Sequence, residues 1–266
     1  MPTVESPASA LRPPLKWAGG KRWQVPHLRP LWAPHARRRL VEPFCGGLAV
    51  SLGLQPARAL LNDTNPHLIS FYRWLQRGLR IEIEMANDKA LYYRHRRRFN
   101  ELLETGEGAS AEAAGLFYFL NRTGYNGLCR FNASGAFNVP FGKYESIRYV
   151  RDFSPYREAF AHWDFAQGDL GALALRKDDF VYADPPYDVP FTQYSAGGFS
   201  WADQERTAGM LAGHPGPVVL VNQATPRVIA LYRQLGYSIR FLTAPRRISN
   251  TGDRTPAREV IATRNL

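Results

Sequence analysis

The segment VEPFCGGLAVSLGL (41–54) combines an apolar stretch, a turn with two glycines and an apolar helical pattern. Glycines at such a turn let the backbone bend tightly and let a ligand approach it closely. The next apolar stretch, RALLND (58–63), ends on Asp63, where a carboxylate can accept hydrogen bonds from ribose hydroxyls. A plain turn explains the glycines alone, but the acid at this interval favours a nucleoside site. Leu48 stands where a second spaced glycine would be, which disfavours a pyrophosphate ligand.

Short apolar stretches alternate with helical patterns along much of the remaining chain. This alternation predicts an α/β fold with a mainly parallel sheet that helices cover on both faces. The expected strands are 39–44, 58–63, 179–184, 217–222, 238–244 and 259–265. The expected helices are 47–55, 66–77, 201–213 and 226–235.

The middle of the chain has a different pattern. Residues 78–118 are expected to be largely helical, and 121–144 are rich in Gly, Asn and aromatic residues. The second stretch predicts a loop or hairpin with a turn at 132–135. We therefore expect one domain formed by 1–75 and 161–266, interrupted by an inserted module at 76–160.

Composition limits the class of protein. The chain has 266 residues, of which 45% are hydrophobic and 13% aromatic, enough for a buried core. Its net charge of +11 favours a polyanionic partner, nucleic acid first, over a charge that serves only solubility. Two distant cysteines predict neither disulfides nor a zinc site. The N-terminus does not resemble a signal peptide and no apolar run is long enough for a membrane span, so we expect a soluble, cytoplasmic protein.

The segment VYADPPYDVPF (181–191) sets the expected chemistry. Proline cannot donate to a sheet ladder, so the strand must end on Asp184, at the edge where ligands of parallel sheets bind. The Asp184 carboxylate and the Pro185 carbonyl offer two acceptors, and Tyr187 offers a flat ring. This set suits a planar group with an exocyclic amine. The alternative interpretation is a strand end followed by an incidental Pro-Pro turn without a binding role.

Six segments together resemble the Dam-type DNA adenine N6-methyltransferases, of the D12 class with alpha-type motif order. They are KWAGGK (16–21), EPFCGG (42–47), NDTNPHLI (62–69), NRTGYNGLCRFNASGAFNVPFG (121–142), DPPY (184–187) and RRISNTGDRTPAREV (246–260). The resemblance implies a Rossmann-like methyltransferase fold with a mainly helical target-recognition insert that carries a β-hairpin. It also implies S-adenosylmethionine as methyl donor and double-stranded DNA, most often GATC, as target, with the adenine flipped out of the duplex.

The resemblance assigns roles to individual residues. The catalytic residues it implies are Asp184, Pro185 and Tyr187. The residues it places around the donor are Trp17, Lys21, Phe44, Gly46, Gly47, Asp63, Asp169 and Asp184. The residues it places on the DNA are Lys16, Arg122, Tyr125, Asn126, Leu128, Arg130 and Asn132. Leu48 departs from the glycine or serine of many members, which puts the geometry of the donor loop in doubt but not the ligand class.

Charge placement agrees with a DNA partner. Residues 11–41 hold eight Lys or Arg and no acid, and 113–144 again hold no acid. Such stretches would face phosphates, and Arg130 suits a bidentate contact with guanine. The basic run at 94–98 is as well explained by a solvated helix face, and 246–254 is a second candidate for backbone contacts.

Two alternatives remain open from the sequence. One is methylation of another amine or amide target, in RNA or protein, and the other is a catalytically silent DNA-binding protein. We expect no metal, because a sulfonium methyl group is already activated by its charge. We further expect a monomer of bacterial or phage origin that acts without a membrane, with any cognate restriction endonuclease acting separately.

Overall fold

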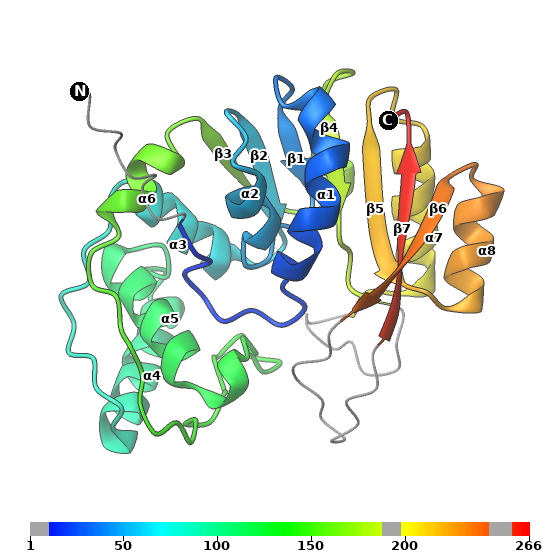
Figure 1. Cartoon of the computed structure of the whole chain (residues 1–266). Coiled ribbons are helices and arrows are strands. Elements are labelled where there is room, and N and C mark those ends of the chain that lie inside the picture. The colour runs from blue at the N-terminus through cyan, green and yellow to red at the C-terminus, as the bar shows by residue number, and fades with distance from the viewer. Residues whose placement is uncertain (1–10, 188–197, 245–256) are drawn as a thin grey trace, which may run out of the picture.

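The computed structural model describes residues 11–187, 198–244 and 257–266. Its described strands form one seven-stranded sheet in the order β3-β2-β1-β4-β5-β7-β6 (Figure 1). The strands are β1 (Leu40–Glu42), β2 (Ala59–Asp63), β3 (Trp163–Gln167), β4 (Phe180–Ala183), β5 (Val218–Gln223), β6 (Ser238–Ala244) and β7 (Ala257–Arg264). The first five are mutually parallel, and β7 is antiparallel to both β5 and β6. The expected α/β fold with a mainly parallel sheet is therefore confirmed.

Helices cover both faces of this sheet. Those of the sheet domain are α1 (Val25–Trp32), α2 (Ala49–Leu54), α3 (Pro66–Gln76), α7 (Trp201–Ala212) and α8 (Pro226–Gln234). Right-handed crossovers lead from β1 through α2 toward β2, and from β4 through α7 toward β5, in opposite directions along the sheet. The two helices consequently lie on opposite faces. The order of strands also reverses between β1 and β4, which is where open sheets of this kind bind ligands.

Side-chain caps begin two of the helices that follow strands of the sheet. Asn65 Oδ1 accepts hydrogen bonds from the backbone amides of His67 and Leu68, and Pro66 occupies the first position of α3. Ser200 and Asp203 form a reciprocal capping box at the start of α7. Each cap satisfies amides that would otherwise have no partner, so both helix starts are well defined.

The middle of the chain forms the insert. Helices α4 (Lys89–Glu104) and α5 (Ala111–Thr123) fulfil part of the helical expectation for 78–118, but the chain between α3 and α4 is not helical. The expected turn is confirmed, because the Gly135 amide donates to the Asn132 carbonyl at 2.9 Å and Phe131 bridges to Phe137. In Figure 1 the insert lies on the side of the sheet where the carboxyl ends of the parallel strands are found. The domain division at 76–160 stays a prediction.

Three elements were not expected from the sequence: α1, β3 and the short helix α6 (Ser154–Ala159). Helix α1 contains a proline within its length, and α6 begins with one near its start. The candidate for backbone contacts at 246–254 lies outside the described residues.

Candidate active site

Three acidic side chains lie at the carboxyl ends of three neighbouring strands. Glu42 is the last residue of β1, Asp63 is the last residue of β2, and Asp184 directly follows β4. Because β1 lies between β2 and β4 in the sheet, the ends that carry Asp63 and Asp184 are separated by one strand only. The strand ends thus assemble the nucleoside-binding and amine-binding features that the sequence placed far apart.

The glycine turn after β1 is shaped by Trp17. Gly46 has a φ of +43°, a left-handed conformation that glycine adopts without strain. A Cβ atom at Gly46 would lie 2.9 Å from Trp17 Nε1, and one at Gly47 would lie 2.8 Å from Trp17 Cβ. The Tyr72 hydroxyl, from helix α3, donates to the Gly46 carbonyl at 2.6 Å and so fixes the turn. Only a chain without side chains at these positions can pass so close to the indole.

Asp63 is tied to the same turn. Its Oδ2 accepts a hydrogen bond from the Gly46 amide at 3.1 Å, and its Oδ1 accepts one from the Asn65 amide at 3.0 Å. Burial raises the pKa of Asp63, and these backbone amides oppose the rise. Each carboxylate oxygen keeps a further lone pair, so the group can accept hydrogen bonds from a ligand while it holds the turn.

Leu48 shows how this chain accommodates its departure from the family pattern. Its φ is +60°, in the region that favours glycine, and its side chain is fully buried. Leucine in this conformation is strained by about 1–2 kcal/mol. Burial of a leucine side chain contributes a stabilisation of about 1.5–3 kcal/mol, which offsets that strain. The loop between β1 and α2 therefore keeps a left-handed turn at Leu48 without a glycine.

Asp184 is paired with Lys21. The Lys21 ammonium lies 3.0 Å from Asp184 Oδ2, donates to the Gly19 carbonyl at 2.7 Å and lies 4.6 Å from the centroid of the Tyr187 ring. Asp184 Oδ1 is buried and has no hydrogen-bond partner within the part of the chain that the structure describes. Burial raises the pKa of Asp184, and the Lys21 charge opposes that rise. A buried acceptor without a partner is costly in an isolated fold, so it marks a place for a donor.

A second buried acid lies next to this pair, on the last strand. Glu259 of β7 accepts a hydrogen bond at 2.6 Å from Nε2 of Gln24. The Tyr182 hydroxyl donates to Oε1 of the same glutamine at 3.0 Å. Burial raises the pKa of Glu259, and the charge of Lys21 opposes the rise. Neither Glu259 nor Gln24 was singled out from the sequence, although the segment around Glu259 belongs to one of the six quoted motifs.

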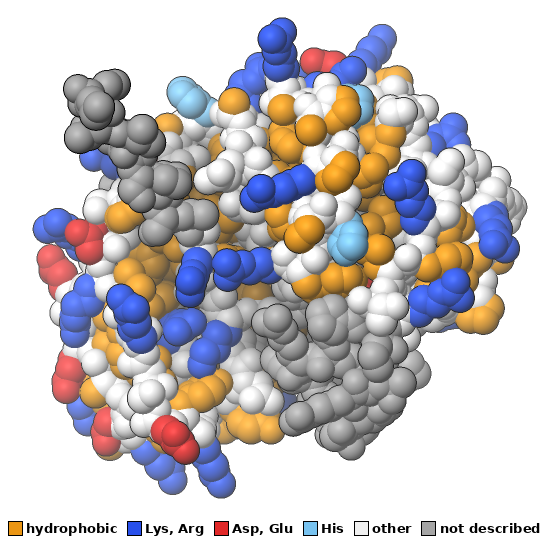
Figure 2. Space-filling model, in the orientation of Figure 1, with side chains coloured by type: hydrophobic (Ala, Val, Ile, Leu, Met, Phe, Trp, Pro, Cys, Tyr) orange, Lys and Arg blue, Asp and Glu red, His pale blue; other side chains and the backbone are white. Residues whose placement is uncertain are grey.

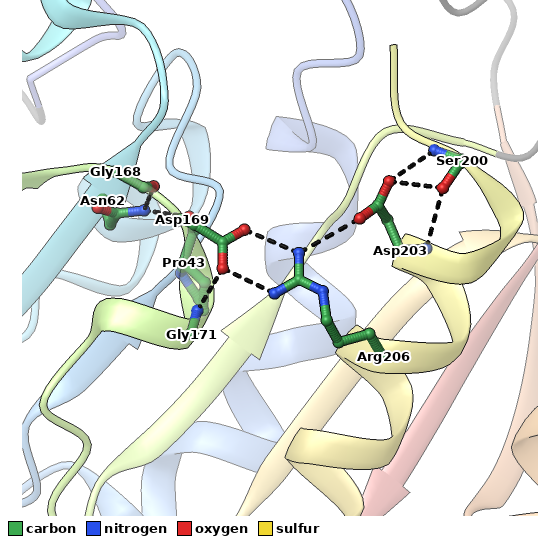
Figure 3. A network of polar contacts seen from close by, with 8 residues as sticks. All are labelled: Pro43, Asn62, Gly168, Asp169, Gly171, Ser200, Asp203 and Arg206. Carbon is green, nitrogen blue, oxygen red and sulfur yellow. Dashed lines mark hydrogen bonds and ion pairs between the residues drawn. The ribbon is translucent and has the colours of Figure 1, made fainter. Parts of the chain in front are cut away.

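Asp169 lies two residues beyond the carboxyl end of β3 and faces Arg206 of α7 (Figure 3). The Gly168 amide donates to the Asp63 carbonyl at 3.2 Å, which brings the two strand ends together. Arg206 of α7 binds the Asp169 carboxylate through two hydrogen bonds of 2.7 and 2.8 Å. These bonds lower the pKa of Asp169 to about 2. Phe44 lines the same region and packs edge-on against Phe199, with ring centroids 5.8 Å apart.

The expected DNA-contacting residues gather where α5 ends and the hairpin begins. Tyr125 is 50% exposed, and its amide donates to the Pro140 carbonyl, so an aromatic side chain projects from a fixed turn. Asn126 has a φ of +53°, and Leu128 is half-buried. Arg130 is exposed and donates to Asn138 Oδ1 at 2.8 Å. Lys and Arg side chains outnumber acidic ones on the face drawn in Figure 2.

Two other expected DNA-contacting side chains, those of Asn132 and Lys16, also have structural partners. Asn132 Oδ1 accepts hydrogen bonds from the Ser134 and Ala136 amides and holds the hairpin turn. Lys16 Nζ donates to the Arg122 carbonyl at 3.0 Å and lies 3.5 Å from the centroid of the Tyr144 ring. Burial and the charge of Arg122 lower the pKa of Lys16 to about 8.

The basic run at 94–98 lies on α4, and part of it serves the fold. Arg96 donates to the Val139 carbonyl at 3.0 Å, and Arg98 binds Glu112 through bonds of 2.7 and 2.9 Å. Among the residues that the structure describes, no group of His, Cys, Asp and Glu side chains is suited to hold a metal ion. No helix within those residues is long and apolar enough to cross a membrane.

The fold and this site define a methyltransferase, and comparison with known proteins identifies its family. Residues 17–243 match the model of the D12 class N6 adenine-specific DNA methyltransferases, so the chain belongs to that family. It is 35% identical to the retron Ec67 DNA adenine methylase of Escherichia coli, over 93% of this chain and 90% of that protein. It is also 35% identical to a DNA adenine methylase of Vibrio cholerae, over 90% of each chain. A type II methyltransferase of Lactococcus lactis, M1.LlaDCHI, is 33% identical over 84% of this chain and 85% of that protein. The chain is accordingly an adenine-specific DNA methyltransferase, which excludes the catalytically silent alternative.

Proposed function

We propose that this enzyme transfers the methyl group of S-adenosylmethionine to N6 of an adenine that is flipped out of a GATC site in double-stranded DNA. The observation that carries the chemical part is the buried, unpartnered Oδ1 of Asp184 at the end of β4. Family membership supports the adenine and the DNA. The donor, the flipping and the target sequence are our proposals.

The residues present fit the methionine and nucleoside parts of the donor. Gly46 and Gly47 let the turn pass close to Trp17, and Asp63 stands at the end of the neighbouring strand with acceptor capacity left. Asp63 would hold the ribose hydroxyls, and Asp169 would lie toward the adenine of the donor. When bound, the donor supplies an electrophilic methyl group that is activated by the sulfonium charge.

The residues after β4 would activate the target amine. The lone pair of an adenine amine is delocalised into its ring, which makes the nitrogen a poor nucleophile. Hydrogen bonds from the amine to Asp184 and to the Pro185 carbonyl would favour a tetrahedral nitrogen with a localised lone pair. Methyl transfer would form the N–C bond as the S–C bond of the donor breaks, and the nitrogen would lose one proton. Asp184, whose pKa is raised by burial, would receive that proton.

Positioning accounts for much of the expected rate enhancement. In-line alignment of amine and methyl group can supply on the order of 7–11 kcal/mol. Extracting the base from the duplex costs a few kcal/mol, and stacking on Tyr187 would return about 1–3 kcal/mol per base. The exposed Tyr125 could occupy the space that the base leaves, and Arg130 could read a guanine in the major groove.

A single experiment tests the proposed function. DNA from cells that express the wild-type chain or Asp184→Ala is sequenced for methylated bases, and both proteins are assayed in vitro with labelled donor on duplex DNA and on RNA. We expect N6-methyladenine within GATC from the wild type, none from the variant and retained DNA binding by both. Methylation within another sequence would refute the GATC assignment, and full activity of Asp184→Ala would refute the catalytic one.

A further inference from the structure

The turn after β4 is held by a glutamine from the following helix. Gln204 of α7 is 3% exposed, and its Nε2 donates to the Pro186 carbonyl at 2.6 Å. Two consecutive prolines supply no backbone N–H groups, so the turn offers almost only acceptors for its own fixation. A donor must therefore come from elsewhere in the fold, and Gln204 provides one.

The orientation of the Gln204 amide is set by a chain of buried groups. The backbone amide of Gln223 donates to Asn222 Oδ1 at 2.8 Å, and a backbone amide can only donate. The Asn222 amino group therefore faces Gln204, where it donates to Oε1 at 3.0 Å. Asn222 is fully buried and its amino group also lies 3.4 Å from the Tyr232 hydroxyl. With Oε1 occupied in this way, the Gln204 amino group must face the Pro186 carbonyl.

We propose that Gln204 is a positioning residue for methyl transfer. By holding the Pro186 carbonyl, it fixes the rotation of the turn and keeps Asp184 and the Pro185 carbonyl directed at the target amine. This inference rests on the proposed function of Asp184. It adds a buried relay that begins on β5, passes through α7 and ends at the Pro186 carbonyl, two residues after Asp184.

Two variants separate the hydrogen bond from the volume of the side chain. Gln204→Leu removes the donor, and a misplacement of about 1 Å at the reacting groups can cost on the order of a hundredfold in rate. We expect kcat to fall tenfold to a hundredfold, by the same reasoning, with little change in KM for donor or DNA. Thr207→Val is the matched control, because Thr207 lies on the same helix, is equally buried, and its hydroxyl has no partner among the described residues.

Gln204→Glu supplies a readout that a purely structural role would not move. A protonated glutamic acid has one O–H to donate to the Pro186 carbonyl and one carbonyl to accept from Asn222, so it mimics the amide. The ionised form has no donor. The ratio of Gln204→Glu activity to wild-type activity should thus rise as the pH falls. A new negative charge that acted only by raising the pKa of Asp184 would make this ratio fall instead.

The outcomes distinguish this inference from the one it rests on. If Asp184→Ala is inactive but Gln204→Leu, folded by circular dichroism, keeps wild-type kcat, only the role of Gln204 is overturned. If Asp184→Ala stays active, both proposals fall. If Gln204→Leu does not fold, the pH ratio of Gln204→Glu still decides, and a flat or falling ratio overturns the positioning role.

Discussion

Replacing Lys21 with methionine should move the acid limb of the pH–activity profile to higher pH. The Lys21 ammonium lies 3.0 Å from Asp184 Oδ2, and only 6% and 18% of the two side chains are exposed. At an effective dielectric constant of about 20, two unit charges at this separation attract by about 5 kcal/mol. One pKa unit corresponds to about 1.4 kcal/mol, so the attraction sets an upper limit near four units. Partial exposure reduces it, and a neighbouring opposite charge typically shifts a carboxyl pKa by about 1–3 units.

The direction of the shift follows from the role of Asp184. Its pKa is already raised by burial, and Lys21 opposes that rise, so removing the ammonium raises the pKa further. Asp184 must be ionised to accept the amine proton, so activity is lost as the pH falls through this pKa. The assay is kcat/KM for duplex DNA between pH 5 and pH 9 at saturating donor, with Lys21→Arg as the charge-retaining control. An acid limb at the same pH in Lys21→Met and in wild type would refute the reasoning, even if the rate were lower.

Three further predictions concern the donor turn, a buried acid and base reading. Gly47→Ala should destabilise the fold by about 1–3 kcal/mol, because the new methyl group would overlap Trp17. It should also weaken donor binding, measured by calorimetry, and an unchanged Kd for the donor would contradict this. Burial raises the pKa of Glu42 from 4.5 to about 8. Between these two pH values the folded state binds one proton more than the unfolded state. The free energy of unfolding therefore falls as the pH rises through this range. Denaturant unfolding of Glu42→Gln should lack this slope of up to about 1.4 kcal/mol per pH unit, and an identical slope in both proteins would argue against it. Arg130→Ala should lose about 1–3 kcal/mol of discrimination at one base pair, measured as kcat/KM on cognate and singly substituted duplexes; unchanged discrimination would rule out its reading role.

The parts of the fold that could be predicted are those whose signal is local. Strands β4 and β5 are continuous apolar runs because helices cover both of their faces, and each was found within a residue or two. Strand β3 was missed because it alternates buried Trp163 and Phe165 with exposed Asp164 over five residues at the edge of the sheet. So short an alternation is easily read as loop.

Helix α1 was missed for a different reason. Its sequence, VPHLRPLW, contains Pro30, and proline in the interior of a helix removes the bond from its own nitrogen to the carbonyl four residues earlier. Here that carbonyl belongs to Pro26, in the first turn, so the loss falls at the end of the helix where it is least costly. Val25, Leu28 and Trp32 then bury one face, and packing outweighs propensity.

The candidate site divides in the same way. Asp184, Pro185 and Tyr187 are contiguous, and Asp63 ends a strand, so local sequence sufficed to propose them. Gln204, Asn222 and Glu259 come from α7, β5 and β7, and each is an unremarkable polar residue in its own segment. They come near Asp184 only because the sheet order places β5 next to β4 and β7 next to β5, which no local pattern states. Whether a polar residue is buried depends on the folded structure and cannot be predicted from its local sequence.

The segment KWAGGK (16–21) joins the insert to the glycine turn and to Asp184. Asn121 of the insert holds the backbone of Lys16 from both sides, accepting from its amide at 2.9 Å and donating to its carbonyl at 2.8 Å. The next residue, Trp17, shapes the glycine turn, and Lys21 pairs with Asp184. Six consecutive residues therefore touch the insert, the donor turn and the reacting carboxylate. Because Asn121 is itself buried, a shift of the insert cannot leave Lys16 in place without breaking both hydrogen bonds, so the position of the insert and the geometry at Asp184 are linked through one short stretch of backbone.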